Sequence, residues 1–370
     1  MPGPAPGTAH AATTTDVVCL GESMVTFLPS QPGRLADVPS FGRGIGGAES
    51  NVACALAAAG HRAAWVGRVG ADGFGDHLVE TIAGYGVDTS AVRRDPGRPT
   101  GIYFRTATDR GAGAHEVAYY RAGSAASAMS PSNVPYGEVF AGRILHLSGI
   151  TAALSGDCLA LLRELTAERP GRPLVSFDVN HRPHLWRGGD ASVLLELARR
   201  SDLVFVGEDE AEEAWGIEGA EAIRAALPEP SVLVVKRGSA GATVFSGLRP
   251  GPRSSNAGGA EDAAAGTGSG DTVTHVPALH VDVVAAVGAG DAFAAGFLSA
   301  TLRGLPVRDR VRHGHLMAAA VLTVPGDLTE PPARDHADRL AALDDGAWGR
   351  LRLGPGWTAV DRAPEEVRTP

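Results

Sequence analysis

Short apolar runs that alternate with segments of helical periodicity constrain the fold of this chain more than any other feature. The apolar runs predict buried strands at residues 17–20, 63–69, 144–148, 174–178, 203–206 and 233–236. The spacing of apolar residues predicts helices at 48–59, 157–168, 192–199 and 220–227. This alternation is typical of an α/β fold, in which helices cover a mostly parallel sheet and ligands bind beyond the carboxyl ends of the strands.

Composition indicates a globular protein and limits its partners. Hydrophobic residues make up 44% of the 370 residues, which is enough to fill a large core. The net charge of −9 argues against nucleic acid or an anionic membrane as the main partner. Cys19, Cys54 and Cys158 form no CxxC pair and the N-terminus has no signal-peptide pattern, so we expect a cytoplasmic protein.

One region interrupts the alternation. Residues 101–106 and 116–121 are rich in β-forming side chains and are joined by a Gly- and Ala-rich turn, so they predict a hairpin outside the main sheet. Together with residues 24–28 this hairpin is expected to form a small β-sheet lid over a binding site, drawn from about 22–45 and 98–122.

Three segments are expected to lie outside the packed domain, which we place at residues 16–347. Residues 1–15 have the composition of a disordered leader, and residues 348–370 that of a flexible tail. Residues 247–274 are rich in Gly, Ala, Ser and Pro and poor in apolar side chains, which predicts a mobile insertion.

The run Val287-Gly288-Ala289-Gly290-Asp291 leads directly into a helical pattern. Its small residues let a ligand approach the backbone, and the free N–H groups of a first helical turn favour a negative charge there. Asp291 either caps the helix or takes a proton from a hydroxyl group. An anion cradle beside a carboxylate suits phosphoryl transfer from a nucleotide to an alcohol.

The glycines at 42–47 match GxGxxG by letter, but residues 35–41 make a poor strand and no acidic residue follows at the next strand's end. A dinucleotide site is therefore disfavoured. These glycines instead join the helix start at 46–53, where a polyhydroxylated ligand can lie against the backbone and Asn51 can donate and accept hydrogen bonds. The chain has no GxxxxGK[ST], HExxH or GxSxG motif, which disfavours a P-loop kinase, a zinc protease and an α/β-hydrolase.

Basic and aromatic side chains follow several predicted strands and mark the hairpin. Lys236 to Gly241 follows one strand and either packs against a nucleotide or forms an ordinary turn. Arg182 lies just beyond another strand, and Tyr119 and Arg121 lie on the hairpin. Each arginine either binds a carboxylate or phosphate or forms a surface ion pair, and their joint placement favours the binding role.

Taken together, these motifs resemble the ribokinase-like (PfkB) sugar kinases. The resemblance is carried by GGAESNVA at 46–53, GRVGADGFG at 67–75 and VGAGDAFAAGF at 287–297, in that order. It implies a three-layer α/β sandwich with a β-sheet lid, ATP as phosphoryl donor and Mg²⁺ as its helper. We also expect a homo-oligomer formed through the lid.

Within that family the chain looks most like the 2-keto-3-deoxygluconate kinases, through GESM at 21–24, TGIYF at 100–104, YYRAGSAAS at 119–127, DVNHR at 178–182 and VPGD at 324–327. The resemblance implies phosphorylation of the terminal hydroxyl of that sugar acid, a reading that paired arginines suit because the substrate carries a carboxylate. A fructokinase or another ketose kinase is the alternative within the family, and a non-catalytic sugar-binding relative is the alternative outside it.

The same resemblance assigns roles to individual residues. Asp291 matches the catalytic base, with the anion hole at Gly288, Ala289 and Gly290. Residues that match sugar contacts are Gly47, Asn51, Tyr103, Tyr119, Arg121, Arg182 and Asp327. Residues that match the nucleotide side are Asn180, Lys236, Arg237, Gly238 and Gly241, and Glu210 matches an indirect magnesium contact.

Two departures from the family pattern change what the resemblance implies. Ala285 and Ala286 stand where the family has Asp-Thr, so a monovalent-cation site is not expected. Gly207 replaces the Asn of an NxxE motif, while Glu210 keeps the acidic end. The intact Asp291 disfavours a merely binding relative, because binding requires no base.

Overall fold

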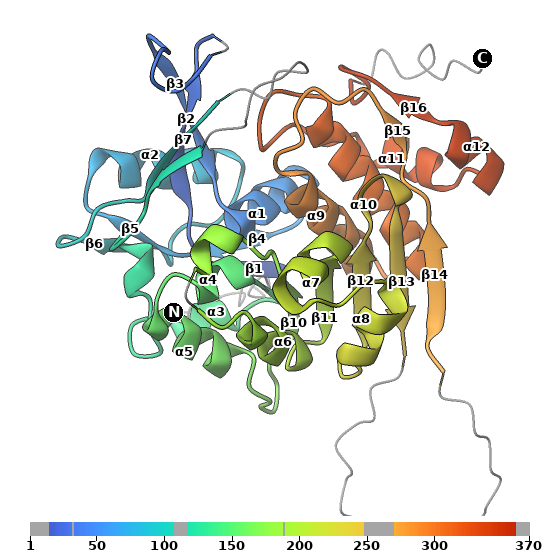
Figure 1. Cartoon of the computed structure of the whole chain (residues 1–370), viewed down its shortest axis with the longest axis horizontal. Helices are drawn as coiled ribbons and strands as arrows, with labels where there is room; N and C mark the ends of the chain where they lie inside the picture. Colours follow the sequence, from blue (N-terminus) through green and yellow to red (C-terminus); the bar gives the residue numbers. More distant parts are fainter. Residues whose placement is uncertain (1–14, 32, 107–116, 188, 248–269, 360–370) are drawn as a thin grey trace, which may run out of the picture.

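The computed structural model describes residues 15–31, 33–106, 117–187, 189–247 and 270–359. An eight-stranded sheet forms the centre of the molecule in the order β14-β13-β12-β11-β10-β9-β1-β4 (Figure 1). Its parallel strands are β1 (Val17–Leu20), β4 (Ala63–Val66), β9 (Ile144–Ser148), β10 (Leu174–Asp178), β11 (Leu203–Gly207) and β12 (Val232–Lys236). The predicted parallel sheet is therefore confirmed.

The sheet ends on one side in two antiparallel strands that the periodicity did not indicate. These are β13 (Ala242–Ser246) and β14 (Thr272–Val276), which pair with β12 and with each other. The long segment between them leaves and re-enters the sheet at paired positions, because Ser246 lies opposite Thr272. Antiparallel neighbours need no crossover helix, so an insertion of any length fits at this edge.

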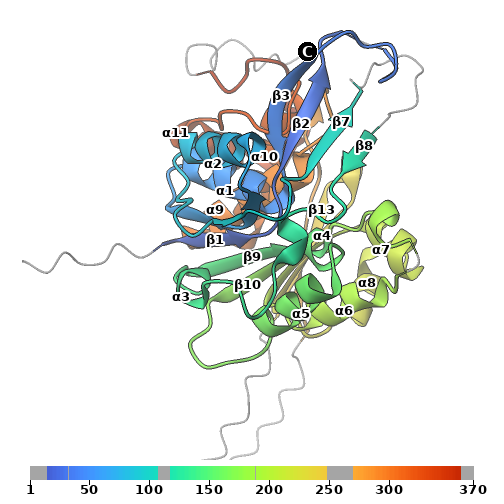
Figure 2. The ribbon, with the colours of Figure 1, turned by 90° about the vertical axis from the view of Figure 1, so that its left-hand side faces the viewer.

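Helices cover both faces of the sheet and complete a three-layer sandwich (Figures 1 and 2). One face carries α1 (Ala48–Ala58), α2 (Gly73–Gly84), α9 (Ala289–Leu302), α10 (Val307–Leu322) and α11 (Arg334–Ala341). The other carries α3 (Tyr136–Val139), α5 (Gly156–Leu165), α6 (Ser192–Arg199), α7 (Glu208–Trp215) and α8 (Ala220–Ala226). Strand side chains alternate between two separate hydrophobic cores, so the parallel strands are apolar on both faces.

Local signals in the sequence fix where several of these helices begin. Asp72 caps α2 by accepting hydrogen bonds from the backbone of Phe74 and Gly75, and Ser155 caps α5 through the backbone of Cys158. Such caps satisfy N–H groups that have no partner within the helix. The remaining short elements are α4 (Gly149–Ala152), the 3₁₀ turns η1 (Ala126–Ala128), η2 (Pro183–Leu185) and η3 (Gly238–Ala240), and the paired strands β5 (Arg68–Gly70) and β6 (Arg93–Asp95).

A separate four-stranded sheet rises from one side of the sandwich, as Figure 2 shows. Its order is β3 (Phe41–Gly46), β2 (Met24–Pro29), β7 (Ile102–Arg105) and β8 (Val117–Tyr120), which confirms the hairpin and the small lid sheet. Gly42 and Gly44 of the GxGxxG match lie within β3, opposite β2, and its last glycine, Gly47, is the N-cap residue of α1. The match therefore spans a lid strand and the start of α1 and is not the phosphate-binding turn of a dinucleotide fold.

Two expected boundaries are corrected by the structure. Residues 272–274 belong to β14, so the insertion is shorter than 247–274, and residues 248–269 lie outside the described part. Residue 348 does not begin a tail, because α12 (Asp345–Arg350) and β16 (Arg352–Leu353) continue the fold, with β16 pairing with β15 (His280–Val281). The leader at 1–14 and residues 360–370 also lie outside the described residues.

Trp348 shows why the boundary moves. Its side chain is fully buried, its Nε1 donates a hydrogen bond to the carbonyl of Pro277 at 3.0 Å, and its ring lies 4.6 Å from the Arg312 guanidinium. Trp357 is also buried. Composition suggested a tail because Gly and charged residues surround these aromatic anchors.

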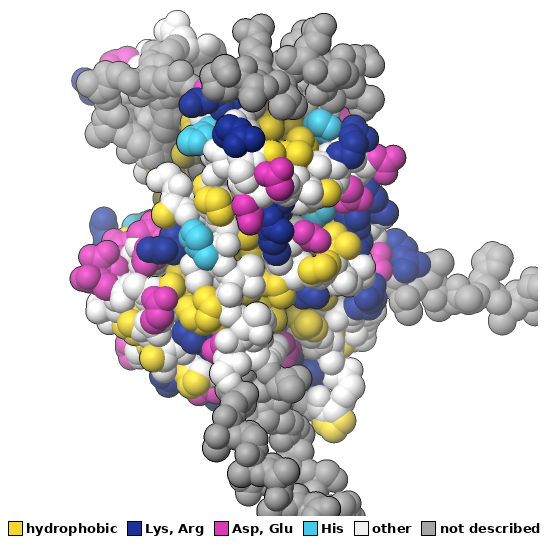
Figure 3. Space-filling model, turned by 90° about the vertical axis from the view of Figure 1, so that its right-hand side faces the viewer, with side chains coloured by type: hydrophobic (Ala, Val, Ile, Leu, Met, Phe, Trp, Pro, Cys, Tyr) yellow, Lys and Arg dark blue, Asp and Glu magenta, His cyan; other side chains and the backbone are white. Residues whose placement is uncertain are grey.

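The surface around α12 and β14 mixes basic and acidic side chains without a block of either sign (Figure 3). Within the described residues, no helix is both long and apolar enough to cross a bilayer.

We expect a variant that ends at residue 347 to be strongly destabilised, and one that ends at residue 359 to keep its stability. Loss of a fully buried Trp costs about 3–5 kcal/mol by itself, and the shorter variant loses Trp357 as well. Urea unfolding followed by circular dichroism measures both. Equal free energies of unfolding for the two variants would contradict the packing described above.

Candidate active site

A pocket of about 370 Å³ lies between the lid and the carboxyl ends of the central strands. Most of the predicted site residues meet there, as the strand-end rule requires. Those that line it are Gly47, Asn51, Tyr103, Tyr119, Arg121, Asn180, Arg182, Glu210, Lys236, Gly288, Ala289, Gly290, Asp291 and Asp327. They come from the lid, from the ends of β10 and β12, from the starts of α1, α7 and α9, and from the segment that follows α10.

Asp291 lies in the first turn of α9 but does not cap it. The N-cap residue is Gly288, and the helix has no side-chain cap. The Asp291 carboxylate instead accepts a hydrogen bond from Nδ2 of Asn51 at 2.8 Å. Of the two readings the sequence left open, capping is therefore excluded, and the carboxylate is available to a ligand.

Burial shifts the pKa of the Asp291 carboxylate. Removal from water raises the pKa of Asp291 to about 7, with a smaller contribution from the negative charge of Asp178. The hydrogen bond from Asn51 and the charges of Arg182 and Lys236 act in the opposite direction. A carboxylate with a pKa near neutral can take a proton and release it again, which suits a general base.

The start of α9 forms an anion cradle beside Asp291. Gly288 adopts φ 78°, and a Cβ there would lie 2.6 Å from the carbonyl oxygen of Asp327, so only glycine fits. The backbone N–H groups of Ala289, Gly290 and Asp291 open the helix, where they have no intrahelical partner. They therefore point an ordered set of donors at the pocket.

Lys236 adds a positive charge to this cradle. Its Nζ lies 3.7 Å from the position a Cβ would take on Gly290, and 3.0 Å from Oδ1 of Asp178. Burial alone would lower the pKa of Lys236, but the carboxylates of Asp178 and Glu210 raise it above its ordinary value. The ammonium group is thus held charged and fixed in position.

The lid is tied to the body through Asp327. This buried carboxylate accepts hydrogen bonds from Nη2 of Arg105 at 2.6 Å and from the hydroxyl of Tyr103 at 3.2 Å, both on β7. Burial raises the pKa of Asp327, although Arg105 and Tyr103 oppose the shift. Tyr119 on β8 stacks on His184 of η2 at 4.7 Å between ring centroids, which makes a second contact between lid and body.

Arg121 is not free at the edge of the lid. Its guanidinium forms a buried ion pair with Glu22, and Ser124 donates a second hydrogen bond to the same carboxylate at 2.7 Å. Arg182, by contrast, is half-exposed and lies 3.4 Å from Glu210. The two arginines thus offer different surroundings to a ligand.

Several buried polar atoms of this pocket have no hydrogen-bond partner among the described residues. They are Oδ1 of Asn51, Oδ1 of Asn180, Nε of Arg105, Nε of Arg121 and Nε2 of His184. Buried polar atoms in native proteins are nearly always paired, so we expect a bound ligand or water to form the missing hydrogen bonds of these atoms. Because the set contains acceptors and donors, the matching ligand carries groups that both donate and accept, as hydroxyl groups do.

Three predicted nucleotide residues lie outside the pocket wall. Arg237, Gly238 and Gly241 form the connection between β12 and β13, where Gly238 has φ 54° and Gly241 φ 104°. Arg237 pairs with Glu208 at 3.2 Å. This turn directly follows the strand that carries Lys236, and its role in nucleotide binding stays a prediction.

Glu210 lies at the pocket but is partly engaged. Its Oε2 accepts from the backbone N–H of Gly207 at 2.8 Å, and its Oε1 faces Arg182. No group of three or more His, Cys, Asp or Glu side chains suited to a metal ion occurs within the described ranges. The donor set fits a cation that is held mainly by ligand oxygens and water, with Glu210 as a nearby carboxylate.

Sequence reasoning missed four ionisable residues of the pocket, Glu22, Arg105, Asp178 and His184. Alternation along β7 could have identified Arg105, since it shares a face with Tyr103 two residues earlier. Asp178 ends β10 within a motif already recognised, yet no role was assigned to it. Nothing in the sequence distinguishes Glu22 or His184, because both depend on contacts across the fold.

The family model of the pfkB family carbohydrate kinases matches residues 14–334. A 2-dehydro-3-deoxygluconokinase of Bacillus subtilis is 33% identical over 327 residues, which cover 86% of this chain and 93% of the relative. A probable chloroplastic fructokinase of Arabidopsis thaliana is 28% identical over 82% of this chain and 75% of the relative.

Among solved structures, a PfkB protein from Polaromonas sp. JS666 superimposes with a TM-score of 0.72 at 30% identity. The match covers 89% of this chain and 100% of that one. The ribokinase-like sandwich with a small lid sheet is therefore confirmed. The family match spans most of the folded domain and includes the lid, the cradle and Asp291, so this chain belongs to the pfkB family of carbohydrate kinases and is a sugar kinase.

Proposed function

We propose that this kinase transfers the γ-phosphoryl group of ATP to the terminal hydroxyl of 2-keto-3-deoxygluconate or a close relative. The observation that carries the proposal is the partly buried Asp291 with its raised pKa, next to the amides of the α9 start and facing a pocket of unpaired donors and acceptors. Similarity to the 2-dehydro-3-deoxygluconokinase of Bacillus subtilis supports the choice of substrate.

The groups around Asp291 account for the proton transfer and for the charge that develops during phosphoryl transfer. The hydroxyl oxygen of the sugar attacks the γ-phosphorus, the bond from that phosphorus to the bridging oxygen of ATP breaks, and the hydroxyl proton passes to Asp291. The backbone N–H groups of Ala289, Gly290 and Asp291 stabilise the charge on the transferring group, with Lys236 beside them. Asn51 keeps the Asp291 carboxylate oriented through its 2.8 Å hydrogen bond.

We assign Mg²⁺ to the phosphate side of the pocket, where it would neutralise phosphate charge. Glu210 would approach it through water, since one carboxylate oxygen already binds the Gly207 N–H group. Asn180, Lys236 and the turn at Arg237, Gly238 and Gly241 remain our assignment for the nucleotide.

Two arginines that differ in exposure and ion pairing, Arg182 and Arg121, would bind the carboxylate of a sugar acid. Arg182 is half-exposed, with its Nη1 3.4 Å from Glu210, so its remaining donors can turn to a substrate carboxylate. Arg121 pairs with Glu22, yet its Nε is buried and unpaired among the described residues, so it can donate one further hydrogen bond. A neutral ketose would need neither contact, and a fructokinase is the alternative that the Arabidopsis relative supports.

We also propose that the enzyme is cytoplasmic and forms an oligomer through the lid. Cys19, Cys54 and Cys158 are buried free thiols, which suits the reducing cytoplasm. Tyr120 on the edge strand β8 is 64% exposed, which suits an oligomer that pairs through the lid.

We expect Asp291→Asn to lower the turnover number at least about a hundredfold, the usual scale for a lost general base. ATP binding should stay nearly intact, because the cradle amides are unchanged. Asp335→Asn is the matched control, since Asp335 also lies in the first turn of a helix but faces solvent. Near-normal turnover of purified Asp291→Asn would exclude the base role.

The pKa of Asp291 predicts two dependences on pH. The base must be ionised, so kcat/KM should rise with pH and level off above about 7. In the folded state the pKa of Asp291 lies above its unfolded value, so the stability it contributes is present below pH 4 and lost as pH rises through 7.

Asp291→Asn lacks this loss of stability. Its free energy of unfolding should therefore exceed that of the parent increasingly from pH 4 to pH 7 and by a constant amount above. Chemical denaturation without ligands at several pH values measures the difference. A difference that does not vary with pH would contradict the raised pKa.

Substrate choice is tested by Arg182→Leu against two substrates. Loss of a charge-assisted contact should lower kcat/KM for the keto acid roughly ten- to a hundredfold and leave the weak turnover of fructose unchanged. Arg187→Leu, an exposed arginine of the same segment, is the control. Arg121→Leu needs Glu22→Gln beside it, because the single change leaves a buried carboxylate unpaired. Equal losses for both substrates would argue for a ketose kinase.

A further inference from the structure

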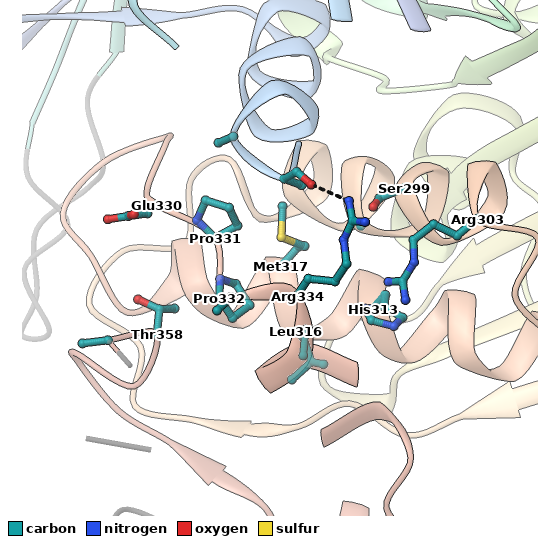
Figure 4. A pocket seen from close by; sticks show the side chains of 16 residues that line it. Ser299, Arg303, His313, Leu316, Met317, Glu330, Pro331, Pro332, Arg334 and Thr358 are labelled. Atoms are coloured by element: carbon teal, nitrogen blue, oxygen red, sulfur yellow. Dashed lines mark hydrogen bonds between the residues drawn. The ribbon is translucent and has the colours of Figure 1, made fainter. Parts of the chain in front are cut away.

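A second cavity of about 360 Å³ lies among the helices that cover one face of the central sheet, and Figure 4 shows it from close by. It is bounded by the end of α1, by α9 and α10, by α11 and by the segment that leads into α11. Within the described residues, none of its lining side chains belongs to the catalytic pocket. Its volume is close to the 370 Å³ of the catalytic pocket and suits a molecule of metabolite size.

Positive and hydrogen-bonding groups meet at one end of this cavity. Arg303 from the end of α9, Arg334 from the start of α11 and His313 from α10 lie around it, with the Ser299 hydroxyl nearby (Figure 4). Asp338 occupies Nη2 of Arg303 at 2.7 Å and faces Nε2 of His313 at 3.2 Å. That leaves further nitrogens of Arg303 without a carboxylate in the described structure.

Arg334 is the group with most capacity for a ligand. Its Nη2 donates to the backbone carbonyl of Ala59 at 3.1 Å, and it has no ion pair with any described residue. The guanidinium is thereby positioned but its charge is not neutralised. The rest of the cavity wall is mostly apolar, with Leu316, Met317, Pro331 and Pro332, while Glu330 lies at the far end (Figure 4).

The segment from Asp327 to Arg334 connects the two cavities. Asp327 lines the catalytic pocket and holds the lid through Arg105, while Arg334, seven residues later, lines the second cavity. A small cavity between them is lined by Asn51 and Asp327 on one side and by Met317 and Pro331 on the other. This small cavity leaves the packing between the two larger ones incomplete.

We propose that this cavity is a second, non-catalytic binding site for a small organic anion, and that its occupancy changes the affinity of the catalytic pocket for sugar. The anionic group binds Arg334 and Arg303, and an apolar part rests on Met317 and Pro331. Movement of the segment that follows Asp327 transmits the change, because Asp327, at the start of that segment, holds the lid through Tyr103 and Arg105. The chemistry shared by carboxylates and phosphate esters defines the ligand class.

Isothermal titration calorimetry on the full chain tests the site. The catalytic pocket is first saturated with a non-hydrolysable ATP analogue, so that anions do not enter the cradle. The probes are inorganic phosphate, glycerol 3-phosphate and citrate, with glycerol as the neutral control. We expect one or more of the anions to bind, and the pattern among them distinguishes a phosphate from a carboxylate ligand.

Two variants test whether the anion binds in the second cavity. Arg334→Gln should weaken the anion at least roughly tenfold, the scale of a lost charge-assisted contact. Arg339→Gln, on the same helix but outside the cavity, should leave it unchanged. Binding of none of the anions, or equal effects of the two variants, overturns the site.

Coupling between the cavities is tested by measuring whether bound sugar changes the affinity for the anion. If the anion changes the affinity for sugar, bound sugar changes the affinity for the anion by the same factor. We expect the dissociation constant of the anion to differ several-fold with and without saturating sugar in the parent chain. Identical constants overturn the coupling. The anion titration and the two variants need no sugar, whereas the coupling measurement rests on the proposed function and uses 2-keto-3-deoxygluconate as the saturating sugar.

Discussion

The hydrogen bond from Asn51 to Asp291 is the contact on which the site depends most. It joins the first turns of two helices whose residues lie 240 positions apart in the sequence. Both helices begin at the edge of the sheet where the parallel strands end, so their free amides and the buried carboxylate share one small volume. If α1 and α9 were displaced, the base, its orienting partner and the anion cradle would separate together.

Removal from water changes the acid–base behaviour of the Asp291 carboxylate in this contact. A solvated aspartate at a helix start would stay ionised and serve as a cap. Enclosed by the pocket and close to Asp178, Asp291 has its pKa raised to about 7, while Asn51 and Lys236 limit the shift. The same desolvation that tunes the base weakens the folded state above neutral pH, so reactivity and stability are opposed at one residue.

Charge compensation organises the lid. Arg105 pairs with Asp327 and Arg121 pairs with Glu22, so the lid arginines face internal carboxylates before any substrate arrives. Buried ion pairs of this kind add little net stability, but breaking one is costly. They fix where the lid sits, and they leave Arg182 as the arginine of the pocket whose charge is most accessible to a sugar acid.

The parallel sheet, the lid hairpin, the position of α1 and the family are predictable from the amino-acid sequence, because periodicity and runs of small residues are local signals. The same signals identify most of the residues that meet in the pocket. Only the folded chain shows that Arg121 pairs with Glu22, that Asp291 is no cap, that Trp348 anchors the C-terminal elements, and that a second cavity lies beside Arg334. These features depend on which segments distant in sequence come into contact, and burial and charge compensation exist only once those contacts form.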